Sequence, residues 1–192
     1  MKVVAFNGSP RKDGNTFIAL NIVLDELKNE GIETELFQIG SENIKGCNVC
    51  MLCKKTKDGL CAIKSDSLNN ALSGIYDSEG FIIGSPTYFG SITPEAKAFI
   101  DRVGYCSRAS GRSLLKRKVA AGIGIARRAG SVNVCNQINN LLLLSECIIP
   151  ASTYWNIGIA REKGEINEDK EGIETFRILG QNMAWLLKRI YA

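Results

Sequence analysis

The sequence contains no histidine among its 192 residues. Histidine is the side chain whose ordinary pKa lies closest to neutral pH, and it is the usual general base that activates a serine or cysteine nucleophile. A Ser-His or Cys-His catalytic pair is therefore excluded within this sequence. If the protein is an enzyme, we expect a cofactor to carry its chemistry.

Long apolar runs and a strong excess of one charge are also absent. No apolar stretch approaches the roughly 20 residues that a helix needs to cross a bilayer, and no cationic start precedes an apolar signal core. Lys and Arg outnumber Asp and Glu by only 24 to 20. We therefore expect a cytoplasmic, soluble protein that binds neither nucleic acid nor a membrane. Its length suits a single domain over residues 1–192.

Cysteine, by contrast, occurs seven times. Thiols in a cytoplasmic protein mostly stay reduced and an odd number cannot all pair, so metal or redox chemistry is favoured over a disulfide framework. Four cysteines share one segment, in which three are spaced CxxCxxC and the fourth follows after seven intervening residues: Cys47, Cys50, Cys53 and Cys61. Three thiols at this spacing can converge from one tight loop on an inorganic centre, and a fourth can complete its coordination. The spacing predicts a metal site.

The spacing leaves the occupant of that site open. A structural zinc ion is typically held by two separated pairs of ligands, so CxxCxxC followed by one more cysteine favours an iron–sulfur cluster over zinc. The same thiols could instead be free or disulfide-linked. The other three cysteines, Cys106, Cys135 and Cys147, are predicted to be buried as small apolar side chains.

Apolar runs and helical periodicities alternate along the chain. The expected strands span residues 2–6, 33–39, 80–84, 118–126 and 147–154. The expected helices have their N-caps at Asn15 or Thr16, Asp66, Thr93, and Asn167 or Asp169, and one further helix starts at Val132. The helix after Thr93 is expected to end at Val103. Residues 40–65 lack a sustained period and are predicted to form a cysteine-rich loop. The alternation predicts an α/β protein with a parallel sheet covered on both faces.

In such a sheet, ligands bind beyond the carboxyl ends of the strands. The loop at residues 8–16 combines hydroxyls, an amide, a guanidinium and two glycines directly before a helix. Its N–H groups and the helix dipole are suited to a phosphate, with further hydrogen bonds from Ser9, Arg11, Asn15 and Thr16. Neither GxxxxGK[ST] nor GxGxxG is present, which argues against nucleotide hydrolysis and dinucleotide binding.

Two further loops follow predicted strands. Residues 85–91 offer exposed backbone groups and the aromatic side chains of Tyr88 and Phe89, which could surround a flat ring. Residues 127–130 form the third loop. Each loop alone could be an ordinary turn, but together they predict one site for a ligand with a phosphate and a ring.

Four segments carry a resemblance to a known family: FNGSPRKDGNT (6–16), GSPTYFGSITPEAKAFIDR (84–102), ARRAG (126–130) and EDKEGIETFRILG (168–180). They resemble the NADPH-dependent FMN reductase branch of the flavodoxin-like flavoproteins. The four-cysteine segment is similar to the motif of the iron–sulfur flavoproteins within that branch. The resemblance implies a flavodoxin-like, three-layer α/β/α fold with a five-stranded parallel sheet in the order 2-1-3-4-5.

The resemblance also implies cofactors. The FMN phosphate is expected on Ser9, Arg11, Asn15 and Thr16, and a second loop is expected to line the ring and ribityl chain with Pro86, Thr87, Tyr88, Phe89 and Gly90. The third loop contributes Arg128, Ala129 and Gly130; relatives often carry Gly-Gly there, so Ala129 departs from the pattern. A 4Fe-4S cluster is expected on Cys47, Cys50, Cys53 and Cys61, and no catalytic side chain is expected.

The function implied is FMN- and cluster-dependent electron transfer from a donor such as a ferredoxin or NAD(P)H to an unknown acceptor. Members of this family resemble one another in forming homo-oligomers, so a homodimer or homotetramer is expected, in which one subunit's cluster approaches another's flavin. Two alternatives stay open. The first is an NAD(P)H-dependent FMN or quinone reductase without a cluster, and the second, less favoured, is a zinc-stabilised binding module.

Overall fold

A computed structural model describes residues 1–191, which are built around a five-stranded, all-parallel sheet. Its strands are β1 (Lys2–Asn7), β2 (Glu33–Gln38), β3 (Gly80–Pro86), β4 (Val119–Ala126) and β5 (Ile157–Ile159). They lie in the order β2-β1-β3-β4-β5. The predicted α/β class and strand order are therefore confirmed.

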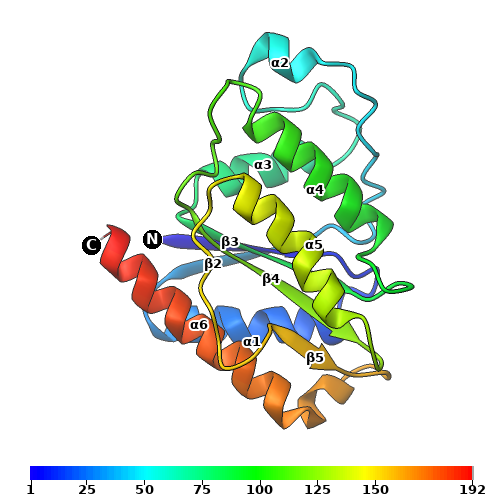
Figure 1. The fold of residues 1–192 in the computed structure, drawn as a ribbon, viewed down its shortest axis with the longest axis vertical. Coiled ribbons are helices and arrows are strands. Elements are labelled where there is room, and N and C mark those ends of the chain that lie inside the picture. Colours follow the sequence, from blue (N-terminus) through cyan, green and yellow to red (C-terminus); the bar gives the residue numbers. More distant parts are fainter. Residues whose placement is uncertain (192) are drawn as a thin grey trace.

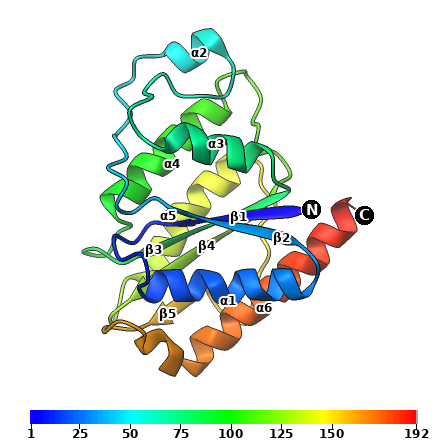
Figure 2. The same ribbon diagram turned by 180° about the vertical axis from the view of Figure 1, so that it is seen from behind.

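Helices cover both faces of the sheet (Figures 1 and 2). One face carries α1 (Asn15–Asn29) and α6 (Lys170–Tyr191), and the other carries α3 (Leu68–Tyr76), α4 (Pro94–Ser107) and α5 (Ser131–Leu144). The short helix α2 (Leu52–Thr56) lies beyond α3 and α4, at the end of the molecule farthest from α6. A 3-10 turn, η1 (Glu165–Glu168), precedes α6. Among the described helices, none combines the length and the apolar character of a membrane span.

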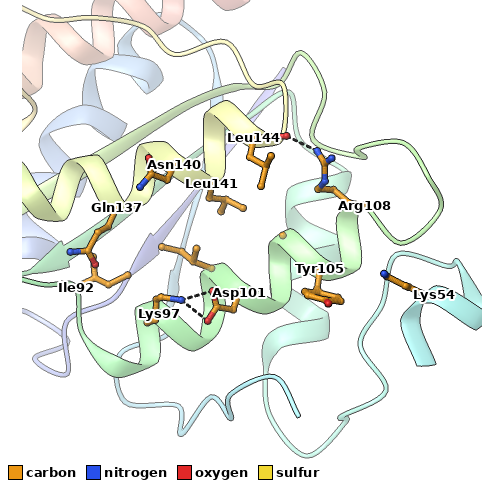
Figure 3. Close-up of a pocket in the computed structure, with 12 residues that line it drawn as sticks. Lys54, Ile92, Lys97, Asp101, Tyr105, Arg108, Gln137, Asn140, Leu141 and Leu144 are labelled. Carbon is orange, nitrogen blue, oxygen red and sulfur yellow. Dashed lines mark hydrogen bonds and ion pairs between the residues drawn. The ribbon is translucent and has the colours of Figure 1, made fainter. Parts of the chain in front are cut away.

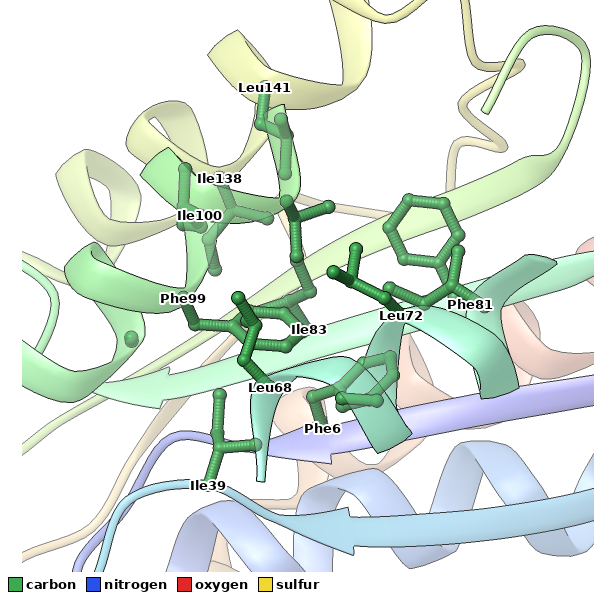
Figure 4. Packing of buried hydrophobic residues seen from close by; sticks show 14 of the residues in the cluster. Phe6, Ile39, Leu68, Leu72, Phe81, Ile83, Phe99, Ile100, Ile138 and Leu141 are labelled. Carbon is green, nitrogen blue, oxygen red and sulfur yellow. The ribbon is translucent and has the colours of Figure 1, made fainter. Parts of the chain in front are cut away.

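The core is divided by the sheet because side chains alternate along each strand. Val3 and Ala5 of β1 pack toward α1 and α6, whereas Val4 and Phe6 pack toward α3 and α4. The Phe6 ring lies 4.8 Å from the Phe99 ring of α4, centroid to centroid, within the cluster drawn in Figure 4. Burying each such side chain stabilises the fold by about 1.5–3 kcal/mol. The central strands are thereby held rigidly from both sides.

The expected fifth strand at residues 147–154 is wrong. Within this run only Ile148 pairs with the sheet, through an isolated bridge to Val119. Pro150 lacks the N–H that a continuous ladder needs, so the run cannot pair along its length. β5 forms later, where Ile157–Ile159 pairs with Gly124–Ala126, beyond the end of the expected strand.

Two helix N-caps also differ from expectation. Gly14, not Asn15 or Thr16, is the N-cap of α1, and Ser67, not Asp66, precedes α3. Neither cap residue makes a side-chain capping bond. The Asn15 side chain bonds a different loop, as described below, whereas Asp66 Oδ1 accepts a hydrogen bond from the N–H of Leu68, the first residue of α3, at 3.3 Å.

The predicted cap of α4 is confirmed. The Thr93 hydroxyl accepts a hydrogen bond from the Ala96 N–H at 3.2 Å and donates one to the Gly8 carbonyl at 2.8 Å. Pro94 follows at the first helical position, where its missing N–H is not needed. α4 continues to Ser107, past the expected end at Val103. One threonine thus starts a helix and ties it to the loop after β1.

Close packing of β4 against α5 yields a test of the fold. A Cβ atom at Gly124 would lie 2.4 Å from the Ser131 carbonyl oxygen, so Gly124→Ala should lower the free energy of unfolding by about 1–3 kcal/mol through overpacking. Gly46→Ala is the matched control, because nothing lies within 4 Å of its Cβ position and its effect should stay within about 0.5 kcal/mol. Urea unfolding followed by circular dichroism measures both; equal stabilities for the two variants would contradict this packing.

Candidate functional site

The loops after β1, β3, β4 and β5 enclose a pocket of about 170 Å³ at the carboxyl edge of the sheet. It brings together all four residues predicted for the phosphate and three predicted for the ring, and it is lined by Ser9, Arg11, Asn15, Thr16, Pro86, Thr87, Tyr88, Ile125, Arg127, Ala160 and Arg161. The loops that follow the strands therefore come together at one pocket, as predicted.

The loop after β1 is held in shape by hydrogen bonds between its backbone and nearby side chains. Ser9 is buried; its N–H donates to Asn7 Oδ1 at 3.1 Å, and its hydroxyl accepts from the Arg11 N–H at 3.1 Å. Gln38 Nε2 donates to the Ser9 carbonyl at 2.6 Å. α1 begins directly after this loop and carries no acidic residue in its first turn. The positive end of its dipole is therefore available to an anion at the pocket.

Asn15 has a different environment from the one expected of a free phosphate ligand. Its Nδ2 donates to the Glu162 carbonyl at 2.8 Å, and its Oδ1 accepts from the Gly164 N–H at 2.9 Å. The amide therefore ties the start of α1 to the loop after β5. Asn15 therefore lines the pocket and, through these two hydrogen bonds, also fixes its shape.

Two arginines that line the pocket were not predicted from the sequence. Arg127 and Arg161 line it together with Arg11, and all three are exposed. Arg127 is the first residue of the predicted third loop, directly before the residues expected at the cofactor, and could have been included with them. Arg161 could not have been found, because β5 was expected in the wrong segment. Three guanidinium groups around so small a pocket favour an anionic ligand.

The loop after β3 folds into a two-residue hairpin between Tyr88 and Ser91, whose N–H groups donate to each other's carbonyls at 2.8 and 3.0 Å. Phe89 and Gly90 occupy its tip with φ angles of 49° and 78°, as a type I′ turn requires. The Phe89 side chain is fully exposed. A large residue in the left-handed region with its ring in solvent indicates a surface shaped for contact rather than for the core.

Thr87 supplies an unsatisfied group within the pocket. Its backbone N–H donates to the Ile125 carbonyl at 2.7 Å. Its buried Oγ1 has no hydrogen-bond partner in the described chain. Buried hydroxyls are nearly always paired, so this atom is suited to a polar edge of a bound ligand.

The loop after β4 packs on the loop after β3. Gly130 has a φ of 93°, and a Cβ atom there would lie 2.8 Å from Thr87 Cγ2. Only glycine suits both the angle and the space. Phe89, Gly90, Arg128, Ala129 and Gly130, which were expected at the cofactor, do not line the pocket itself.

The four predicted metal-site cysteines line a second cavity of about 20 Å³ under the cysteine loop, residues 46–61. Cys53 is buried and Cys61 half-buried, while Cys47 and Cys50 are exposed. All are free thiols. Across residues 1–191, no three His, Cys, Asp or Glu side chains lie close enough to hold a metal ion. Four thiols facing one hollow are nevertheless the donor set of an iron–sulfur or zinc centre.

The backbone of the cysteine loop bends sharply. Val49 and Met51 have φ angles of 54° and 60°, and such conformations cost non-glycine residues about 1–3 kcal/mol each. Cys47, Cys50 and Cys53, which lie on either side of these bends, all line the same cavity. Cys61 is placed by α3, since its N–H donates to Asn69 Oδ1 at 2.8 Å and its carbonyl accepts from Asn69 Nδ2 at 2.9 Å.

Helix α4 forms the floor of this cavity with Arg102, Tyr105 and Cys106. Cys106 is buried as predicted, but beside Cys53 and Cys61; burial and these two neighbouring thiols raise the pKa of its thiol. Sequence reasoning treated Cys106 only as a packing residue. Its spacing of four from Arg102, one helical turn, is the sequence signal that both face the same side.

Arg102 is the one Lys or Arg side chain of the described chain that is buried. Its Nη1 lies 2.5 Å from Asp66 Oδ2, and its Nε donates to Cys61 Sγ at 3.3 Å. Burial alone would raise the pKa of Asp66, but hydrogen bonds from Arg102 and the Lys45 N–H outweigh it and hold this pKa below its usual value. Both members of the pair therefore stay charged.

A wider groove of about 600 Å³ runs between α4 and α5 (Figure 3). Lys97 and Asp101 form an ion pair along it, and Arg108 binds the Leu144 carbonyl at one end. Tyr105 lines both this groove and the cysteine cavity. None of the residues predicted for the cofactors lines the groove.

Comparison with known proteins agrees with this geometry. Residues 1–162 match the family described as NADPH-dependent FMN reductase. The chain is 32% identical to an iron–sulfur flavoprotein of Methanocaldococcus jannaschii, with 99% of each chain covered. It is 26% identical to an iron–sulfur flavoprotein of Methanosarcina thermophila, covering 99% of this chain and 97% of that protein.

Solved structures share the fold at low sequence identity. RosB superposes with a TM-score of 0.77 at 19% identity, covering 100% of this chain and 82% of that one. A WrbA-like flavodoxin from Agrobacterium tumefaciens gives 0.68 at 16% identity, covering 98% and 97%. The fold is therefore flavodoxin-like. From the matched residues 1–162 and the full-length relatives, the chain belongs to the NADPH-dependent FMN reductase family of flavin-dependent oxidoreductases.

Proposed function

We propose that this protein is an FMN-dependent oxidoreductase that also binds a 4Fe-4S cluster and transfers electrons between the two. The observation that carries the proposal is the presence in one chain of an arginine-lined pocket and a separate cavity faced by four thiols. The iron–sulfur flavoproteins among its relatives support it. FMN exchanges electrons in pairs or singly and a cluster exchanges them singly, so together they link two-electron and one-electron partners.

The pocket at the sheet edge fits FMN through its charge and its unpaired hydroxyl. Arg11, Arg127 and Arg161 and the start of α1 would hold the phosphate. The Thr87 hydroxyl would pair with a polar group of the cofactor. Tyr88 and Phe89 expose aromatic surface beside the pocket, which would cover one side of the ring. None of these side chains needs to transfer a proton, consistent with a sequence that lacks histidine.

The cavity under the cysteine loop fits a cluster through its donor set. Cys47, Cys50, Cys53 and Cys61 would each bind as a thiolate. The buried pair, Cys53 and Cys61, lies against α4, and the exposed pair lies on the bent segment above it. Closing the exposed pair onto the cluster would bring the four sulfur atoms together.

The two cavities have no lining residue in common. Apolar side chains are exposed beside both, with Phe89 at one and Val49 and Leu52 at the other. We therefore include in the proposal a homodimer or homotetramer in which these surfaces meet and one subunit's cluster approaches another's FMN. A ferredoxin or NAD(P)H would supply the electrons, and the acceptor is a further redox partner.

Cofactor content tests the cluster directly. Protein purified without oxygen should contain about four iron and four sulfide per FMN, and Cys53→Ala should lose the iron while FMN stays bound, because the two cavities are separate. Cys135→Ala, a buried cysteine of α5 outside both cavities, should keep both. Iron-free wild-type protein that still reduces FMN or a quinone would establish the cluster-free reductase instead, and stoichiometric zinc without FMN would establish a binding module.

The arginines of the pocket generate a second prediction. Arg161→Ala should weaken FMN binding about 10-fold, because one charge-assisted hydrogen bond contributes about 1.5–3 kcal/mol. Binding of riboflavin, which lacks the phosphate, should change little. Arg128→Ala is the matched control, since Arg128 does not line the pocket. Fluorescence titration of the wild type and both variants measures their affinities for FMN and riboflavin; equal losses for the two ligands in Arg161→Ala would contradict a phosphate role.

The assembly is tested by light scattering coupled to gel filtration. The wild-type protein should have the mass of two or four chains. Phe89→Asp should lower the mass and slow electron transfer from FMN to the cluster, because it places a charge on a fully exposed apolar contact. A monomeric wild-type protein with rapid transfer would contradict the proposed assembly.

A further inference from the structure

We propose that Arg102 is a positioning residue for the iron–sulfur site, which holds the ligand Cys61 through an N–H···S hydrogen bond and raises the reduction potential of the cluster. The inference rests on the proposed function, since it assigns a role toward the proposed cluster. Arg102 lies on α4, outside the cysteine motif. Its Nε is 3.3 Å from Cys61 Sγ.

The guanidinium is fixed from several sides. Nη1 and Nη2 contact the two carboxylate oxygens of Asp66 at 2.5 and 3.2 Å. The same two nitrogens donate to the carbonyls of Lys45 at 3.0 Å and Ile63 at 3.2 Å. A planar fork held by these four bonds has one remaining donor direction, along Nε–H, and this direction meets the Cys61 sulfur.

These contacts also place Cys61 relative to the rest of the cavity. The bonded carbonyls belong to residues just before and just after the cysteine loop. Together with the bonds between Asn69 and the Cys61 backbone, Arg102 fixes both the main chain and the sulfur of this residue. Cys61 is thus anchored before any cluster binds, whereas Cys47 and Cys50 are exposed.

Stabilisation of the fold does not by itself explain the buried ion pair between Arg102 and Asp66. Arg102 and Asp66 side chains are each 1% exposed, and removing two charges from water costs several kcal/mol per ion before their attraction is counted. Apolar residues of similar volume often serve a core equally well. A charge kept here, with one donor aimed at a sulfur, fits a role in the chemistry of that sulfur.

The expected effect on the reduction potential of the cluster follows from the positive charge of Arg102. Reduction adds one electron to the cluster and its thiolates, so the reduced site is more negative than the oxidised one. A buried cationic donor stabilises the more negative form, and hydrogen bonds to the sulfur atoms are among the determinants of cluster potential. Little water screens this interaction because the guanidinium is buried.

The decisive variant is Arg102→Lys in the holoprotein. Lysine keeps the positive charge opposite Asp66 but lacks the fork that directs a donor at Cys61 Sγ. Iron and sulfide content, and the midpoint potential from a redox titration monitored by electron paramagnetic resonance, are compared with the wild type. We expect the cluster potential to shift to a more negative value and the FMN potential to stay unchanged. Loss of iron from a folded, FMN-bound variant would also support the proposal, because Cys61 then depends on Arg102.

Arg108→Lys is the matched control, since it makes the same replacement at an exposed arginine directly after α4 and should leave the potential unchanged. If Arg102→Lys does not fold, the double variant Asp66→Asn/Arg102→Gln, which leaves no unpaired buried charge, is judged by the same criterion. A variant with wild-type iron content and wild-type potential overturns the inference. Wild-type protein without a cluster overturns the proposed function and this inference with it, so the two failures are distinguishable.

Discussion

Burial of a parallel sheet on both faces is the constraint on which the rest of this structure depends. Side chains of β1, β3 and β4 pack against helices on either side, and this leaves only the ends of the strands open to solvent. Because all strands point the same way, the loops after four of them meet at one edge. Hydrogen bonds such as that from Thr93 to the Gly8 carbonyl then connect these loops to the core.

The two candidate sites differ in how far the polypeptide alone prepares them. At the sheet edge, hydrogen bonds between side chains and backbone around Ser9 and at the Asn15 amide hold the pocket in shape without a ligand. The cysteine cavity is prepared on one side only, where Arg102 and Asn69 hold Cys61. The other side is an exposed loop with left-handed φ angles at Val49 and Met51, a backbone strain that metal–thiolate bonds at the proposed cluster would offset.

Local signals in the sequence succeeded where one physical effect dominates. Thr93 and Pro94 mark the start of α4 because a hydroxyl cap and a fixed φ act within a single turn. The uncharged run of β4 marks a central strand because only such a strand is buried on both faces. The prediction of the fifth strand was wrong because residues 147–154 and 157–159 both contain apolar side chains, and composition does not show which of them pairs with β4. In the structure Ile157–Ile159 forms this pairing.

By itself the sequence determined the alternation of strands and helices, the four-thiol donor set and the absence of a histidine base, because these depend on residue type and short spacing. Only the tertiary structure decided that Arg161 reaches the pocket, that the Asn15 amide bonds the loop after β5, and that Arg102 meets Cys61. Those contacts join residues 41 to 149 positions apart. No local pattern encodes them, because they exist only after the sheet has brought its loops and helices together.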